Sequence, residues 1–187
     1  MSSYGEILED GSLRFVRLLP GPIERVWSWL ADGEKRARWL AGGGNARAAG
    51  ETIRFEFRHA DLTVHDETIP ENYRALENGV AYDIQVLECD PPHHMKWYWP
   101  DEEGMNTEID IRLSEADGKV KLVLIQRGDV SAEHLVGSTA GWHTHLDIMA
   151  DKLSGETEQP FWKTHEVFVS EYRTRLGDFL ATLGNRV

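Results

Sequence analysis

The chain has 187 residues, of which 41% are hydrophobic and 28% charged, and its formal net charge at pH 7 is −12. This composition is typical of one globular domain, and it disfavours nucleic acid and anionic membranes as partners, because both are bound mainly through clustered Lys and Arg. The single cysteine, Cys89, excludes an internal disulfide, and a polar N-terminus without a long apolar run predicts a cytoplasmic protein with neither signal peptide nor membrane span.

The first elements are a strand and two short helices. Apolar residues alternate over residues 13–19, and this pattern predicts a strand. Residues 23–30 repeat at the helical period directly after Pro22, which suits the first turn of a helix. A second short helix is expected over residues 34–40, before the glycines at 42–44.

The middle of the chain is predicted to be antiparallel sheet. Apolar and polar residues alternate with a period of two, so each strand should have one buried and one wet face. The expected strands cover residues 53–58, 62–67, 82–89, 95–99, 108–113 and 119–124. A polar excursion interrupts them at residues 70–79.

The helical period returns in the last part of the chain. Residues 142–153 place apolar side chains at i, i+4, i+7 and i+11, which predicts a helix that covers the sheet. A heptad seam follows over residues 162–183, and it comprises Trp162, Val169, Tyr172, Leu176, Phe179 and Leu183 among others. We expect this seam to form a homodimer, with docking on the outside of its own domain as the alternative.

Four segments together carry a resemblance to a known family. They read PIERVW at residues 22–27, EKRARW at 34–39, DPPHHMKWYW at 90–99, and Gly-Trp at 141–142. In this order they resemble the homologues of the activator of the heat shock protein 90 ATPase, which belong to the START-like group also called SRPBCC. The resemblance covers roughly residues 13–155, and the chain departs from it in an insertion at 70–79 and an extension over 156–187.

The resemblance implies an α+β helix-grip fold. In this fold a curved antiparallel sheet of six or seven strands wraps a long C-terminal helix, two short helices follow the first strand, and a cavity lies between sheet and helix. We therefore expect an N-terminal tail over residues 1–12, the helix-grip domain over 13–155 and a helical extension over 156–187. The candidate cavity residues are Phe55, Phe57, Trp97, Trp99, His145 and Met149.

The sequence offers little for catalysis or metal binding. His59 and His65 lack the spacing of a zinc site, and we expect neither a metal nor a cofactor. His143 and Asp147 are four residues apart and can touch, but such a pair is more often structural than catalytic. For a cavity enzyme, the best pairing is His145 with Asp110 or Glu108, and both acids should point away from the core.

Three functions follow from these observations. The first is non-enzymatic binding of a small hydrophobic or amphipathic molecule in the internal cavity. The second is a protein-interaction or chaperone-linked module of the stress response that docks through the heptad seam. The third is a cavity enzyme such as a cyclase or hydrolase. We expect the first, because the aromatic residues are numerous and no nucleophile motif is present.

Overall fold

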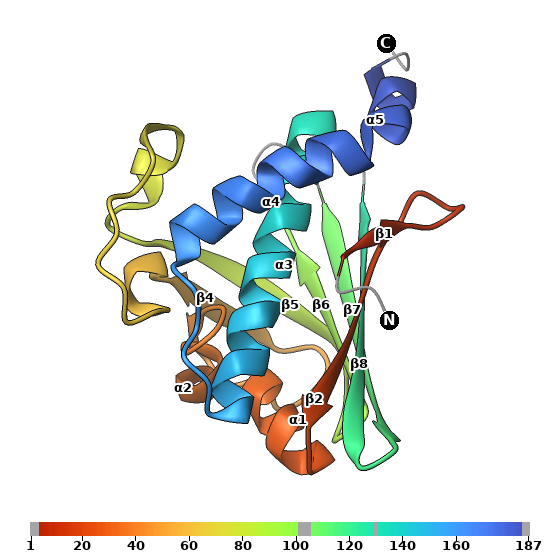
Figure 1. The fold of residues 1–187 in the computed structure, drawn as a ribbon. Helices are drawn as coiled ribbons and strands as arrows, with labels where there is room; N and C mark the ends of the chain where they lie inside the picture. Colours follow the sequence, from red (N-terminus) through yellow and green to blue (C-terminus); the bar gives the residue numbers. More distant parts are fainter. Residues whose placement is uncertain (1–3, 101–105, 129–130, 185–187) are drawn as a thin grey trace.

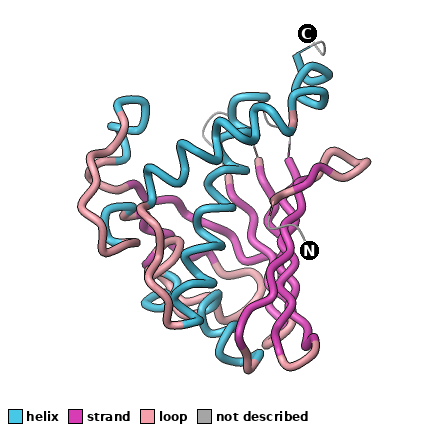
Figure 2. Tube along the Cα trace, viewed as in Figure 1, coloured by secondary structure: helices cyan, strands magenta, loops and turns pink. Residues whose placement is uncertain are grey.

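The computed structural model describes residues 4–100, 106–128 and 131–184, and the side chains of Leu183 and Gly184 lie outside this description. Eight strands form one antiparallel sheet in the order β1-β2-β8-β7-β6-β5-β4-β3. The strands are β1 (Glu6–Ile7), β2 (Leu13–Pro20), β3 (Gly42–Gly43), β4 (Thr52–Phe57), β5 (Val80–Asp90), β6 (His94–Trp99), β7 (Thr107–Ala116) and β8 (Lys119–Gly128). Figure 2 shows them as one continuous, curved layer.

The helices pack on one side of this sheet. They are α1 (Ile23–Ala31), α2 (Gly33–Arg36), α3 (Ala132–Ser154), α4 (Phe161–Arg175) and α5 (Gly177–Gly184), with short 3-10 turns at η1 (His59–Asp61) and η2 (Glu71–Leu76). The long helix α3 lies across the sheet, and α4 crosses α3 (Figure 1). The α+β helix-grip architecture predicted from the sequence is therefore confirmed. None of the described helices combines the length and apolar character that crossing a bilayer requires.

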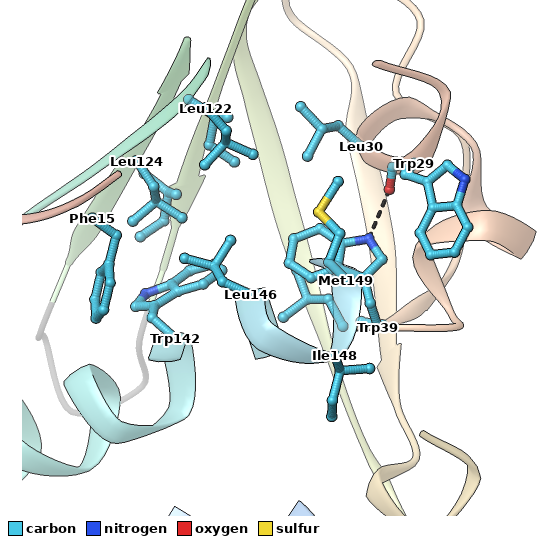
Figure 3. Packing of buried hydrophobic residues seen from close by; sticks show 14 of the residues in the cluster. Phe15, Trp29, Leu30, Trp39, Leu122, Leu124, Trp142, Leu146, Ile148 and Met149 are labelled. Carbon is cyan, nitrogen blue, oxygen red and sulfur yellow. Dashed lines mark hydrogen bonds between the residues drawn. The ribbon is translucent and has the colours of Figure 1, made fainter. Parts of the chain in front are cut away.

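The core lies between α3 and the inner face of the sheet. In β4, buried and exposed residues alternate strictly, so that Phe55 and Phe57 point inward. Figure 3 shows Trp142, Leu146 and Met149 of α3 facing the side chains of β8 and α1. Period-two strands and a helix with an apolar stripe thus bury their two surfaces against each other, which is the main favourable term in folding.

Arg36 holds the segment between α2 and β4 in place from inside the core. Its side chain is fully buried, and its guanidinium donates hydrogen bonds to the carbonyls of Leu30, Ala41 and Gly44, at 3.1, 3.1 and 2.5 Å. It also lies over the ring of Phe55, 4.2 Å from the centroid. Burial lowers the pKa of Arg36 to about 10, which leaves it charged at neutral pH, so this one cation satisfies several buried carbonyls at once.

Several predicted elements differ in the structure. The second short helix, predicted over residues 34–40, ends at Arg36 and is followed by a turn. Residues 62–67 form no strand, because they make hydrogen bonds to Glu158 instead of to a neighbouring strand. Val64 N donates to the Glu158 carboxylate at 3.2 Å, and His65 Nε2 lies 2.9 Å from the Glu158 carbonyl oxygen. The helix predicted from residue 142 begins ten residues earlier, where Ser131 caps it by accepting from His134 N at 3.2 Å.

The predicted heptad seam is divided between two helices, α4 and α5, which meet at Leu176. Residues before the predicted domain also join the fold, because β1 pairs with β2 in the register Glu6 to Arg14. The excursion at residues 70–79 contains η2, and its Tyr73 ring stacks on Trp162 of α4 at 5.1 Å between centroids. The tail, the insertion and the extension therefore all contact the central domain or one another.

Candidate functional site: a cavity under the long helix

A cavity of about 290 Å³ lies between the inner face of the sheet and α3. The sheet contributes side chains from β4 to β8, and α3 contributes one side of its N-terminal half. The described lining residues are Leu40, Phe57, Tyr82, Trp99, Pro100, Thr107, Ile109, Gln126, His134, Ser138, Gly141, Trp142 and His145. Most of this wall is apolar or aromatic, with a few polar groups, as is usual for sites that bind small molecules.

The residues predicted from the sequence to face a cavity divide into two groups. Phe57, Trp99 and His145 line it. Phe55 and Trp97 lie behind this lining, fully buried and packed edge to face with ring centroids 5.1 Å apart. Met149 is also fully buried, in the core one turn further along α3. Phe55, Trp97 and Met149 therefore support the wall from behind and are not among the described residues that line the cavity.

Gln126 lines the cavity and was not predicted to do so, although its position in β8 indicates an inward-pointing side chain. It continues the inward alternation of Leu122 and Leu124 by one more step, so the pattern places it on the buried face of β8. Its Oε1 accepts a hydrogen bond from Trp142 Nε1 at 2.7 Å, and its Nε2 donates to Ser138 Oγ at 3.4 Å. A buried amide at an inward strand position indicates a polar partner or a cavity.

His145 presents one defined hydrogen-bonding group to the cavity. Its Nδ1 lies 2.6 Å from the carbonyl oxygen of Trp39. Because a carbonyl only accepts, Nδ1 must carry the proton. Burial, together with the neighbouring His59, lowers the pKa of His145 to about 3. The ring is therefore neutral near pH 7, and Nε2 holds a lone pair that has no hydrogen-bond partner among the described residues.

The described lining contains no Lys, Arg, Asp or Glu. Asp110, suggested as a partner for His145, instead lies on the outer face of the sheet, where its Oδ1 is 3.0 Å from His94 Nε2. Glu108 pairs with Lys96 at 2.9 Å. His145 is therefore paired with neither Asp110 nor Glu108. Side chains alternate along β7, and both acids are next to residues that point inward, so their own side chains point outward.

The pair formed by buried His143 and half-buried Asp147 belongs to a separate network. Tyr172 Oη lies 2.9 Å from His143 Nδ1, and Asp147 Oδ2 lies 3.4 Å from His143 Nε2. Arg17 donates to Asp147 Oδ1 at 2.9 Å, and Phe168 stacks on the imidazole at 3.7 Å between centroids. Burial, with Arg17 nearby, lowers the pKa of His143 to about 3. Both ring nitrogens of His143 are engaged, so this network joins α4 to α3.

The residues proposed as an interface are mostly turned toward the chain's own domain. Trp162, Tyr172 and Leu176 are buried, while Val169 and Phe179 are half-buried. The side chain of Leu183 lies outside the described residues. On the outward side of α4, Val167 is 50% exposed.

His59 and His65 do not come together as metal ligands. His59 stacks between the aromatic rings of Phe57 and Trp162, at 6.1 and 5.1 Å between centroids, and His65 bonds the Glu158 carbonyl. Within the described ranges, no group of three or more His, Cys, Asp or Glu side chains has an arrangement that would hold a metal ion.

Comparison with known proteins agrees with this architecture. The family model described as "Activator of Hsp90 ATPase homolog 1-like protein" matches residues 20–154. The chain belongs to this family. Within the match lie the sheet from β3 to β8, both short helices and all of α3, and therefore every described residue of the cavity lining. No curated protein matches the chain.

Solved structures extend the comparison beyond the family match. A protein from Bordetella parapertussis is 41% identical, covers 94% of this chain and 91% of its own length, and has a TM-score of 0.77. The uncovered 6% is shorter than the segment after residue 154, so this relative shares at least part of the C-terminal extension. CalU16 from Micromonospora echinospora (18% identity, 91% and 93% covered, TM-score 0.62) and the Aha1 dimer from Colwellia psychrerythraea (16%, 76% and 95%, 0.59) share the fold.

Proposed function

We propose that the protein binds a small hydrophobic molecule in the cavity between the sheet and α3, without transforming it. The observation that carries this proposal is the cavity itself, about 290 Å³ in volume and walled largely by Phe57, Trp99 and Trp142. An apolar cavity of about 150 Å³ is large enough for benzene, so this one suits a molecule of about two fused or linked rings. Binding of hydrophobic ligands is also common in the family.

The described lining offers little to a cavity enzyme, because its histidines are His145 and His134 and it contains no carboxylate. General acid–base catalysis works best when the catalytic pKa lies near the working pH. His145 is far more acidic than that, and no carboxylate belongs to the described lining. A chaperone-linked role has no support beyond the family name, and a shared fold does not fix a function.

Gly141 allows a direct test of the site. It lines the cavity, and a Cβ added there would have nothing within 4 Å. Gly141→Val should therefore fill cavity volume without straining α3. Gly137→Val is the matched control, since Gly137 also lies in α3 with nothing within 4 Å of an added Cβ but is not among the described lining residues.

Binding is measured by the rise in melting temperature with two-ring aromatic compounds. At a hundredfold excess over Kd, a ligand stabilises by about 2.7 kcal/mol, which for a domain of this size is roughly 5–10 °C. We expect this rise in the wild type and in Gly137→Val, and a much smaller one in Gly141→Val, each compared with its own unliganded melt. A shift that survives unchanged in Gly141→Val would place the ligand elsewhere.

Self-association is a separate proposal, for a homodimer that pairs through the outward side of the C-terminal helices. Its support is the exposed Val167 beside half-buried Val169 and Phe179, and the shared fold of the Colwellia psychrerythraea dimer. Sedimentation velocity of the wild type and Val167→Asp tests it: a dimer in the first and a monomer in the second is the expected result. A monomer in both rejects the proposal.

We also propose a reducing, cytoplasmic location, because the chain has a single cysteine and so cannot form an internal disulfide.

A further inference from the structure

We infer that the cavity selects neutral ligands that donate a hydrogen bond to Nε2 of His145, such as a hydroxylated aromatic compound, over hydrocarbons and carboxylates of the same shape. This inference rests on the proposed function, because it specifies the chemistry of a molecule bound in the same cavity.

The hydrogen-bonding role of Nε2 is fixed from outside the cavity. Trp39 lies in the turn that follows α2, 106 residues before His145 in the sequence, and its carbonyl accepts from Nδ1 at 2.6 Å. The Trp39 side chain is itself anchored, since its Nε1 donates to the Trp29 carbonyl at 2.8 Å (Figure 3). The carbonyl therefore holds the imidazole in one tautomer and orientation, in which Nε2 can only accept.

The surroundings of the ring keep it uncharged. Two aromatic rings pack against it: His59 at 5.8 Å and Phe161 at 5.1 Å between centroids. The pKa of His59 is lowered to about 4, mainly by burial and then by His165, whose own pKa is also lowered by burial. His145, His59 and His165 are thus neutral together, and protonating any one of them would place a charge in an apolar region.

The other polar side chains of the described lining are Gln126, Ser138, His134, Tyr82 and Thr107, and no Lys or Arg is among them. Gln126 and Ser138 are bonded to each other, and Gln126 also to Trp142. His134, near the N-terminal end of α3, is the remaining histidine of the described lining. A carboxylate bound here would lose its hydration without gaining a Lys or Arg partner from that lining, whereas a hydroxyl would satisfy Nε2.

The test compares three compounds with the same ring system: 2-naphthol, 2-methoxynaphthalene and 2-naphthoate. Only the first is a neutral donor. Isothermal titration of the full-length wild type near neutral pH should give a Kd for 2-naphthol about 3- to 10-fold below that for 2-methoxynaphthalene, the usual net value of one neutral hydrogen bond. Binding of 2-naphthoate should be weaker still. This comparison uses the wild type alone and does not depend on any variant folding.

His145→Phe keeps a ring of similar shape and removes the acceptor, so it should abolish the preference for 2-naphthol while 2-methoxynaphthalene still binds. His134→Gln, which changes the other lining histidine, should keep the preference. The ¹⁵N chemical shift of His145 Nε2 gives a direct signature: it should move when 2-naphthol is added and stay in place with 2-methoxynaphthalene.

The outcomes separate this inference from the proposed function. Equal affinity for 2-naphthol and 2-methoxynaphthalene overturns the inference and leaves hydrophobic binding in place. Tighter binding of 2-naphthoate also overturns it, and loss of that binding in His134→Gln would assign the anion to His134. If none of the three compounds binds, the proposed function fails for two-ring ligands, and the inference fails with it.

Discussion

Acidification should destabilise this protein through its buried histidines. The pKa values of His143 and His145 are lowered to about 3, and that of His59 to about 4, mainly by burial. An ordinary histidine titrates near pH 6.5. Below about that pH the unfolded chain therefore binds protons that the folded protein does not. The stability is fully present above the unfolded pKa and is lost as the pH falls toward the folded values.

The magnitude follows from the linkage relation. Between about pH 7 and about pH 5.5, each histidine that stays neutral in the fold costs roughly 1.2 kcal/mol of unfolding free energy, so three cost roughly 3–4 kcal/mol. Asp147, whose pKa is raised by burial, acts in the opposite sense. Urea unfolding followed by tryptophan fluorescence, at the two pH values and constant ionic strength, measures the difference.

A variant separates this titration from a general weakening of the fold. His143→Gln will be less stable at both pH values because it loses the stack on Phe168, but its pH difference should be smaller than that of the wild type by roughly 1.2 kcal/mol. His93→Gln is the control, since His93 is exposed, and it should keep the full difference. Equal stability at both pH values, or an undiminished difference in His143→Gln, would refute the reasoning.

Three further predictions concern the contacts that hold the site. Arg36→Met should lower the unfolding free energy by about 3 kcal/mol or more, because several buried carbonyls lose their donor; chemical denaturation measures this, and a loss below about 1 kcal/mol would contradict it. Tyr172→Phe should cost about 1–3 kcal/mol, since its hydroxyl bonds both Gly5 N and His143; an unchanged urea midpoint would be evidence against it. Truncation after Gly155 should destabilise the chain strongly, because it removes four large side chains that are buried on α4. Burying a large apolar side chain is worth about 1.5–3 kcal/mol. A truncated protein as stable as the full chain would contradict this prediction.

Local patterns were sufficient for most of the sheet. The strict alternation in β4 and along β8 places one set of side chains inward whatever the tertiary context, because successive residues of a strand point to opposite faces. Residues 62–67 show the limit of that logic. They alternate as well, yet the carboxylate and carbonyl of Glu158, more than ninety residues away, take the hydrogen bonds that a neighbouring strand would have made.

The start of α3 was missed for a different reason. Its first ten residues, Ala132 to Gly141, contain two glycines, and Leu135 and Val136 are the only large apolar residues among them. Glycine is a poor helix former, so the local pattern favours a loop. The helix persists because Leu135 and Val136 are buried and Ser131 caps the end. The same stretch supplies His134, Ser138 and Gly141 to the cavity, which explains why these three of the five described α3 residues in the wall were not predicted.

The polar character of the site depends on contacts that no local pattern contains. A histidine on the buried side of a helix is equally consistent with a core residue and with a ligand contact, and only the Trp39 carbonyl decides which nitrogen of His145 is free. The C-terminal extension contributes to the same outcome. Phe161 packs on both His59 and His145, at 4.8 and 5.1 Å between centroids, while Glu67 accepts hydrogen bonds from the first amides of α4 and fixes where that helix begins.

This arrangement makes the extension part of the site. Through Phe161, α4 packs on His59 and His145 and contributes to the burial that keeps His145 uncharged. A neutral imidazole with a fixed tautomer can only accept at Nε2, whereas a solvated, protonated one would donate there and attract anions. The same helix-grip cavity could therefore prefer alcohols or carboxylates according to what packs on its far side, which is one physical route by which members of a family with one fold acquire different ligands.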